Sequence, residues 1–222
     1  MVGNNQLTGR SLKQERALRT RAALVRAGAE VFAESGFAGA SVAKIAHRAG
    51  LTLGAMYFHF PSKEELAREI VRSQPDLVVP PVASRGIQHA IDVTLTWGRQ
   101  LVDDPVLLAG ARLVMDQEHF IDPDENSHQQ WVRVMTEDLV DAGRRRELRV
   151  GVQIDAVARL IVYACTGAQM HASLESGRRD LRQRIEEIWH CVLPAIAVPS
   201  VMKRLEFGEA RAGATPTRTA AP

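Results

Sequence analysis

The 222-residue chain is poor in cysteine and holds no extended apolar stretch. Its two cysteines, Cys165 and Cys191, stand far apart and outside any Cys-x-x-Cys or Cys/His spacing, which argues against a disulfide framework or a zinc site. No apolar stretch approaches the roughly 20 residues that span a bilayer, and the N-terminal residues lack the apolar segment of a secretory signal. We therefore expect reduced thiols, a cytoplasmic location, and no membrane or metal partner.

The short motifs of common enzymes are absent as well. His-Glu-x-x-His, Gly-x-Ser-x-Gly, P-loop and Gly-x-Gly-x-x-Gly patterns do not occur, and no two of the seven histidines are four residues apart. Two polar groupings remain as alternatives for catalysis: Asp116 with Glu118 and His119, and His171 near Cys165. We expect no catalytic residues, no cofactor and no enzymatic activity.

The positive charge is unevenly distributed. The formal net charge is only +2, but six basic residues and one acid, Glu15, lie between Arg10 and Arg26. A basic end on a nearly neutral chain indicates a module that binds a polyanion, joined to a second function. We expect Arg10, Lys13 and Arg16 to follow a nucleic-acid backbone or its minor groove as an arm.

Apolar residues recur at intervals of three and four along most of the chain, which predicts an all-α fold. After a first helix that ends at Gly36, the predicted helices cover 41–49, 52–60, 62–77, 85–103, 105–119, 126–145, 154–174 and 179–198. The inward face of the first helix is predicted to be Leu18, Ala22, Val25, Ala29 and Phe32. Gly36 and Gly50 are placed to end helices in the left-handed conformation.

The helices at 41–49 and 52–60 have helix-turn-helix spacing. In that motif the N-terminal part of the second helix enters the major groove. Four ring-bearing residues follow one another at 57–60 in a chain that is only 5% Phe, Trp and Tyr. We expect Phe58 and Phe60 to face inward, while Tyr57 and His59 reach opposite walls of the groove. The alternative is a small aromatic core with a solvated rim.

The remaining candidates for DNA contact surround this helix. Ser41 is a predicted cap, Thr52 and Lys63 are predicted phosphate contacts, and Gly54 and Ala55 leave room for the backbone to approach the duplex. Leu53 either touches a thymine methyl group or packs against its own domain.

The run SVAKIAHRAGLTLGAMYFHFPSKEEL, together with the preceding RAALVRAGAEVFAESGFAG, resembles the DNA-binding domain of TetR-family transcriptional repressors. The resemblance rests on the IA-x-x-AG helix ending, the LT-x-G turn, the YFHF helix and the KE-x-L start of the next helix. It implies that Tyr57, His59 and Lys63 contact phosphates and that Thr52, Leu53 and Gly54 form the groove-entering turn. Many relatives carry a polar residue in place of Leu53, which leaves the base preference open.

The second half resembles the γ-butyrolactone-type autoregulator receptors of actinomycetes, through DDPVLLAGARLVMD, HQQWVRV and IDAVARLIVYACTGAQ. That resemblance implies a small hormone-like effector (a γ-butyrolactone or a related butenolide or furan), a homodimer, and control of secondary metabolism or antibiotic production. It places Trp131 in the effector pocket. The other candidate pocket residues are Gln130, Thr166, Gln169, Met115, Tyr163 and Met170, each of which could instead be ordinary core, as we expect for Trp97 and Trp189.

The expected organisation is a flexible basic arm at 1–12, a helix-turn-helix domain at 13–62, a ligand-binding and dimerisation domain at 63–207, and a disordered tail at 208–222. Within the second domain, 63–78 is the connecting helix. Dimerisation is expected through the helices at 154–174 and 179–198, using Ala158, Ile161, Ala164, Cys165, Ala168, Ile185, Ile188 and Val192. A dimer suits a palindromic operator with half-sites ~34 Å apart. The alternative is a regulator of the same family that answers to another ligand, such as an antibiotic or a pathway intermediate.

Overall fold

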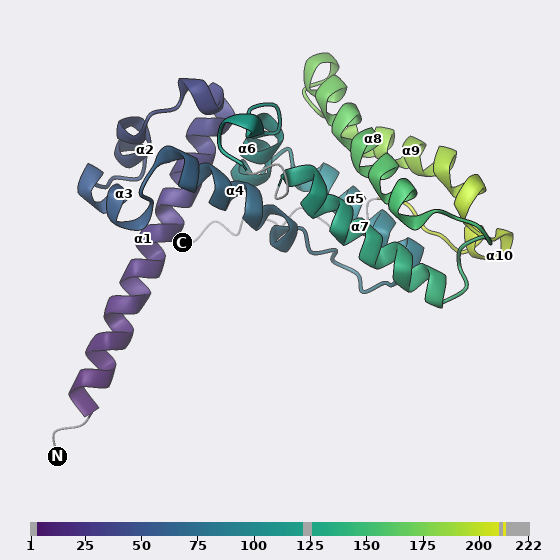
Figure 1. The fold of residues 1–222 in the computed structure, drawn as a ribbon, viewed down its shortest axis with the longest axis horizontal. Coiled ribbons are helices and arrows are strands. Elements are labelled where there is room, and N and C mark those ends of the chain that lie inside the picture. Colours follow the sequence, from purple (N-terminus) through teal and green to yellow (C-terminus); the bar gives the residue numbers. More distant parts are fainter. Residues whose placement is uncertain (1–3, 122–125, 209–210, 212–222) are drawn as a thin grey trace, which may run out of the picture. The chain divides into compact units, whose positions relative to one another are not determined.

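The structure is a computed structural model that describes residues 4–121, 126–208 and 211 (Figure 1). The described residues are helical almost throughout, so the predicted all-α fold is confirmed. The elements in order are α1 (Asn4–Gly39), α2 (Val42–Arg48), α3 (Leu53–His59), α4 (Lys63–Leu77), α5 (Gly86–Gln100), α6 (Pro105–Leu113), the 3₁₀ turn η1 (Gln117–His119), α7 (Ser127–Arg144), α8 (Ile154–Glu175), α9 (Leu181–Ile196) and α10 (Pro199–Met202).

The chain forms two compact units. The first unit contains the residues up to Gln74 together with the segment that begins at Pro105 and ends at Pro123. The second unit contains the segment from Pro75 to Asp104 and the residues after Pro123. The boundary therefore falls inside α4, next to Pro75, and not at the predicted 62/63 junction.

The assignment of α6 and η1 to the first unit differs from the sequence-based expectation, which gave them to the ligand-binding domain. Side-chain contacts with α1 and α4 explain the difference. The backbone N–H of Phe37 donates to Asp116 Oδ2 at 3.1 Å, and the guanidinium of Arg68 donates to the carbonyl of Phe120. The rings of Phe37 and Phe120 stack with their centroids 4.8 Å apart.

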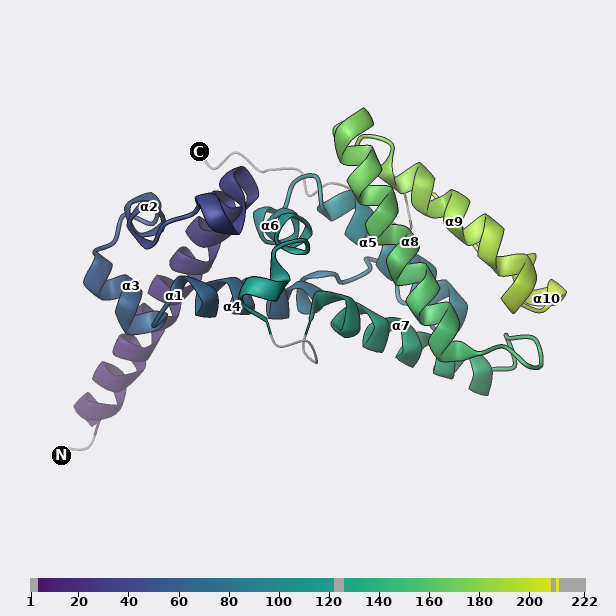
Figure 2. The same cartoon turned by 45° about the horizontal axis from the view of Figure 1, so that its top comes forward.

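The buried face of α1 starts later than predicted. Leu18 is 61% exposed and Ala22 is also exposed, whereas Leu24, Val31 and Phe32 are fully buried. Figures 1 and 2 show the reason, because the N-terminal half of α1 extends past α2, α3 and α4. The sequence periodicity continues along this half, but no helix of the first unit covers it.

The predicted helix end at Gly50 is confirmed, whereas Gly36 interrupts the helical backbone of α1, which then continues to Gly39. Gly36 has φ 68° and Gly50 has φ 66°, a backbone conformation that side chains with a Cβ rarely adopt. The helical backbone begins at Asn4, so residues 4–12 of the predicted flexible arm form the first turns of α1. Residues 1–3 lie outside the described residues. The predicted tail also lies outside them, apart from Gly208 and Arg211.

The second unit is built on four helices, in which α5 packs against α7 and α9, and α8 packs against the same two helices. Trp189 on α9 is fully buried, and its indole N–H donates to Thr94 Oγ1 on α5 at 2.8 Å. The expectation that Trp189 is an ordinary core residue is therefore confirmed. Among the described residues, no helix is long and apolar enough to cross a membrane.

Candidate nucleic-acid interface and apolar cavity

The α2–turn–α3 segment is organised by side-chain caps. Ser41 Oγ accepts from the backbone N–H of Lys44 at 3.2 Å, and Thr52 Oγ1 accepts from the backbone N–H of Ala55 at 3.1 Å. In both bonds the hydroxyl oxygen is the acceptor, so each hydroxyl can still donate its proton to another group. Both residues are exposed, as a phosphate contact requires.

The inward face of α3 is formed by Met56, which is fully buried, and by Phe60, which is 3% exposed. These two residues are four apart and therefore lie on one side of the helix. Phe58, which was predicted to face inward, is 81% exposed, so that prediction is wrong. The cause is helical geometry, since residue 58 is rotated by about 200° from residue 56 at about 100° per residue.

Ring and apolar side chains occupy the outer face of α3. Tyr57 is 52% exposed and Leu53 is 48% exposed, while Ala55 and His59 are half-buried. The exposure of Leu53 goes against its alternative role as a residue packed into its own domain. The Phe58 and His59 rings meet edge to face with centroids 5.1 Å apart. Tyr57 and His59 lie on opposite flanks of this face, as the two-residue separation predicts.

Lys63 was predicted to contact a phosphate, but its ammonium group bonds to carbonyls of its own chain. Its Nζ donates to the carbonyls of Phe37 and Ala40 at 2.8 and 3.1 Å, and it lies 4.2 Å from the centroid of the Phe37 ring. A helix end leaves carbonyls without intrahelical partners. The structure therefore assigns the Lys63 ammonium to capping the C-terminal end of α1. This capping role could not be predicted from the sequence, because the two acceptors are backbone carbonyls 23 and 26 residues away.

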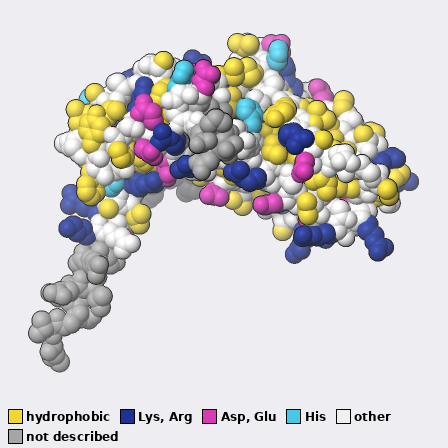
Figure 3. All heavy atoms as spheres, in the orientation of Figure 1, with side chains coloured by type: hydrophobic (Ala, Val, Ile, Leu, Met, Phe, Trp, Pro, Cys, Tyr) yellow, Lys and Arg dark blue, Asp and Glu magenta, His cyan; other side chains and the backbone are white. Residues whose placement is uncertain are grey.

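Other cations of the first unit differ in how fully they are paired. Arg21 bonds Glu69 at 2.5 Å, and Arg48 bonds Glu34 at 2.8 Å. These ion pairs hold the pKa of both carboxyls below their usual range. Lys13 and Arg16, both exposed on α1, have no acidic partner within the part of the chain that the structure describes. Lys and Arg side chains are visible on this stretch of α1 next to the grey N-terminal residues (Figure 3).

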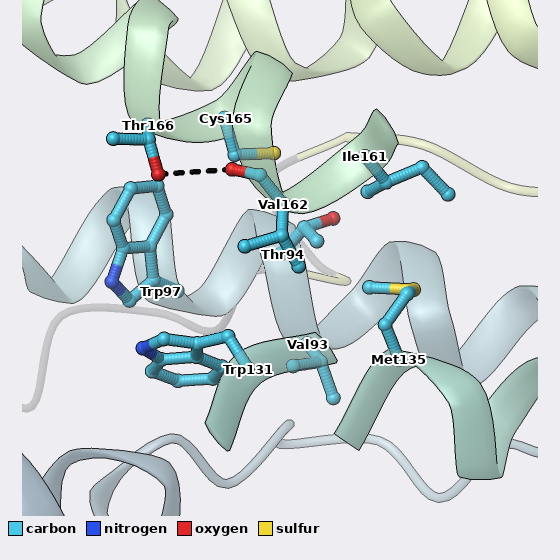
Figure 4. Close-up of a pocket in the computed structure, with 9 residues that line it drawn as sticks. All are labelled: Val93, Thr94, Trp97, Trp131, Met135, Ile161, Val162, Cys165 and Thr166. Atoms are coloured by element: carbon cyan, nitrogen blue, oxygen red, sulfur yellow. Dashed lines mark hydrogen bonds between the residues drawn. The ribbon is translucent and has the colours of Figure 1, made fainter. Parts of the chain in front are cut away.

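The second unit contains an apolar cavity of about 50 Å³ between α5, α7 and α8 (Figure 4). Its walls are Val93, Thr94, Trp97, Trp131, Met135, Ile161, Val162, Cys165 and Thr166. The rings of Trp97 and Trp131 form one end of the cavity, edge to face, with their centroids 6.5 Å apart. Figure 4 shows both indole nitrogens on the same side of the cavity.

Few polar groups reach this cavity. Thr166 donates its hydroxyl proton to the Val162 carbonyl at 2.9 Å, and Thr94 donates its own to the Ile91 carbonyl at 2.8 Å. Toward the cavity, Thr166 can therefore only accept a hydrogen bond. The wall of the cavity is almost wholly apolar, and in Figure 4 the indole nitrogens of Trp97 and Trp131 lie on the side of the rings away from Met135 and Ile161.

Comparisons with known proteins identify the family. Residues 24–70 match the bacterial regulatory proteins of the tetR family, and residues 85–199 match the tetracyclin repressor-like C-terminal domain. This chain belongs to the TetR family. Residues 24–70 include α2, α3 and their turn, so the chain is a TetR-family DNA-binding regulator whose matched domain contains these helices.

Individual TetR-family proteins resemble most of the chain. The A-factor receptor protein of Streptomyces griseus is 33% identical over 87% of this chain and 70% of that protein. The structure of TylP, a TetR regulator from Streptomyces fradiae, has a TM-score of 0.80 and 36% identity, and the match covers 90% of this chain and 89% of TylP. A γ-butyrolactone receptor structure has a TM-score of 0.64 and 25% identity over 85% of this chain and 94% of that one.

Of the predicted pocket residues, Trp131 and Thr166 line the cavity. Met115, Tyr163 and Met170 are instead 67%, 55% and 39% exposed, and Gln130 is absent from the cavity walls. The buried Gln169 is outside the walls too, and its Oε1 accepts from the Arg178 guanidinium at 3.4 Å. The sequence-based choice of Tyr163 and Met170 used the wrong face of α8, because both residues lie more than about 100° from the middle of the arc spanned by the cavity-lining residues 161, 162, 165 and 166.

Trp97 lines the cavity although the sequence indicated ordinary core. A usable signal was its spacing of four from Val93 on α5, which puts both residues on one helical face. Trp97 and Trp131 are far apart in the sequence, so only the packing of α5 against α7 brings them together.

The two groupings considered for catalysis are not arranged for it. Burial raises the pKa of the Cys165 thiol to about 12, which keeps it protonated and unreactive. Asp116 is engaged with the backbone of Phe37, and the His119–Glu118 pair, 3.8 Å apart, is exposed. Within the described ranges, no group of three His, Cys, Asp or Glu residues is placed to hold a metal ion. The matched family consists of regulatory proteins, which fits a protein without enzymatic activity.

Proposed function

We propose that this TetR-family regulator is a homodimeric repressor that leaves its operator when a γ-butyrolactone-type effector enters the cavity between α5, α7 and α8. The observation that carries the proposal is the Trp97–Trp131 end of that cavity. On this proposal the repressed genes belong to secondary metabolism or antibiotic production, in line with the resemblance to a γ-butyrolactone receptor.

The apolar walls of the cavity suit a lactone that carries an acyl chain. On this proposal the indole N–H groups at the Trp97–Trp131 end donate to the carbonyl and ring oxygens of the lactone, both of which are acceptors. A hydroxyl on the effector can donate to Thr166, whose own proton is already used. The apolar walls then cover an acyl chain, which matches the usual composition of small-molecule sites.

The volume of the cavity implies that its walls move on binding. Small-molecule sites typically measure about 300–1,000 Å³, whereas this cavity measures about 50 Å³. An effector larger than one or two waters can be enclosed here only if wall side chains move or the helices separate. The effector then binds the conformation with moved walls more tightly than the conformation with unmoved walls. A ligand-controlled switch depends on such a difference in affinity.

Helix α8 connects the cavity to a second surface. Its inner face supplies Ile161, Val162, Cys165 and Thr166 to the cavity. Its outer face carries an apolar stripe with steps of 3, 4, 3 and 4 residues: Leu160, Tyr163, Gly167, Met170 and Leu174. Leu160 is 54% exposed and Leu174 is 86% exposed, which is costly unless another surface covers them.

This outer stripe is the proposed dimer interface, and it replaces part of the interface expected from sequence. Ala158, Ile161, Cys165 and Ile185 are buried within the chain and cannot meet a partner. Movement of α8 would then change the spacing of two recognition helices. A coupling of ~1–3 kcal/mol would weaken operator binding roughly 5- to 150-fold.

Intrinsic fluorescence offers a direct test of the ligand class. All three tryptophans lie at or next to the cavity, since Trp97 and Trp131 line it and Trp189 bonds to Thr94. Titration with synthetic γ-butyrolactones of increasing acyl length should change the emission saturably, and Trp131→Phe should weaken binding about fivefold by removing one donor. Saturable binding of antibiotics with no response to any lactone would favour the alternative ligand class and overturn this one.

A further inference from the structure

We infer that Phe58, assisted by Leu53, reads the 5-methyl group of thymine in the major groove of the operator. The inference rests on the proposed function, because it assigns a base preference to the same recognition helix. The family match does not supply it, and the sequence alone predicted the opposite orientation for Phe58.

Helix α3 lacks the polar side chains that usually read base edges. Its seven residues, LGAMYFH, include no Arg, Lys, Asn, Gln, Asp or Glu. Those are the side chains that make the strong hydrogen bonds with base edges, such as the bidentate contacts of Arg with guanine and of Asn or Gln with adenine. Tyr57 and His59 can form single hydrogen bonds, but they lie on the two flanks of the helix. The central part of the outer face therefore carries only apolar side chains.

Phe58 lies at the centre of the outward face of α3. The buried residues Met56 and Phe60 define the inward direction of α3. At about 100° per residue, Phe58 points about 180° away from the direction midway between them. It is the most exposed of the large apolar residues on α3, at 81%, and its ring is oriented by the edge-to-face contact with His59.

The face of α3 that carries the Phe58 ring also has open space at Gly54. Gly54 is four residues before Phe58 and therefore shares its face. A Cβ built on Gly54 would meet only Thr52 Oγ1, at 3.8 Å, so the fold has no need of a glycine here. A glycine on the same face as an exposed ring allows the helix backbone to come close to an outside surface. Leu53 lies at the N-terminal end of α3, the end that enters the groove in helix-turn-helix proteins.

The chemistry of the groove selects one partner for such a surface. In the major groove, thymine alone of the four bases presents a methyl group, and apolar side chains such as Phe contact it. Burying one methyl contributes about as much as one CH₂, which corresponds to roughly a fourfold change in affinity. Each half-site should therefore contain at least one thymine whose methyl group affects binding.

The test begins with selection of a high-affinity duplex from a random library by the full-length protein. Each dT of the selected half-site is then replaced by deoxyuridine, which removes only the methyl group. The dissociation constant is measured by fluorescence anisotropy for the wild type, Phe58→Ala, Leu53→Ala and the control Val150→Ala. Val150 is fully exposed in the second unit, so its variant should behave as the wild type does.

We expect deoxyuridine at one or two positions per half-site to weaken wild-type binding about fourfold each, with no such penalty at the corresponding position in Phe58→Ala. Thermal unfolding should be unchanged in this variant, because the Phe58 ring is exposed. Specific binding that is indifferent to every deoxyuridine, or a penalty that persists in both α3 variants, would overturn the inference and leave the proposed function intact. Failure to select any sequence would overturn the proposed function itself.

Discussion

Two glycines occupy helical positions where the fold itself does not require them. A Cβ on Gly54 of α3 would make one ordinary contact, and a Cβ on Gly167 of α8 would meet nothing within 4 Å. Neither has the positive φ that would explain a glycine. Glycine inside a helix costs up to about 1 kcal/mol relative to alanine. Both positions therefore point to surfaces that approach closely from outside the chain.

Gly54→Ala should separate stability from DNA binding. The free energy of unfolding should rise by up to about 1 kcal/mol, because alanine is the better helix former and its methyl group meets only open space. Affinity for the selected duplex should fall roughly tenfold, since the methyl group keeps the helix away from the groove. Calorimetric unfolding and anisotropy measure the two effects. A stabilised variant with unchanged affinity would contradict the placement of Gly54 at the interface.

Lys63→Ala should act on stability and not on phosphate contact. Loss of its bonds to the carbonyls of Phe37 and Ala40 should lower the free energy of unfolding by about 1–3 kcal/mol. The slope of log K against log salt should not change.

Lys13→Ala is the matched control for Lys63→Ala. Lys13 is an exposed cation, and removal of a phosphate contact lowers the salt slope by about 1 without a stability change. A reduced salt slope for Lys63→Ala would instead support the phosphate contact predicted for Lys63 from the sequence.

Tyr57, Phe58 and Lys63 show which orientations and contacts the sequence could predict and which it could not. The YFHF run was recognisable, and the exposure of Tyr57 agrees with its expected place on the surface. The orientation of Phe58 was missed because Met56, and not Phe58, pairs with Phe60 at the spacing of four. That pairing was readable in the sequence. The carbonyl partners of Lys63 were not, because they depend on where α1 ends in space.

Helix α8 has two functional faces on this account, the cavity wall and the dimer stripe. Gly167→Leu should fill the stripe at the point where a partner helix comes closest, and nothing in the chain obstructs the new side chain near Cβ. We expect unchanged helical content and at least a tenfold weaker dimer, measured by light scattering across a dilution series. Equal dimer stability in the variant and the wild type would move the interface elsewhere.

A charged pair joins α5 to α7. His89 Nδ1 lies 2.7 Å from Asp138 Oδ1, and this contact raises the pKa of His89, with smaller contributions from Asp92 and Asp141. A raised pKa in the folded state stabilises the protein fully below the unfolded value of about 6.5. The contribution is lost as the pH rises through the higher folded pKa.

The difference in unfolding free energy between wild type and His89→Gln should therefore be largest near pH 6 and should shrink toward pH 9. Denaturant unfolding at a series of pH values measures it. A difference that is constant over this range would show that the pair does not titrate as the geometry implies.

The helices themselves were the most predictable feature. Periodicity and capping located most helix ends to within a few residues, for example 154–174 against α8 at Ile154–Glu175. Periodicity could not show which part of α1 is covered, so Leu18 and Ala22 were assigned to the core although they are exposed. It also could not show that α6 packs with α1, because that contact depends on tertiary folding.

The assembled protein combines a DNA-reading unit with a unit that contains a cavity and an unpaired apolar stripe. The boundary between them falls within α4 at Pro75, where the missing backbone N–H removes a helical hydrogen bond. We propose α4 as the link through which the effector changes the reading of DNA, because the chain passes through it from one unit to the other.

The decisive measurement is the affinity of the full-length protein for its selected duplex, with and without a saturating γ-butyrolactone. Anisotropy at fixed salt should show operator binding that weakens roughly 5- to 150-fold when the lactone is added and recovers when it is removed. A lactone that binds near the tryptophans and leaves the DNA affinity unchanged would contradict the switch proposed here.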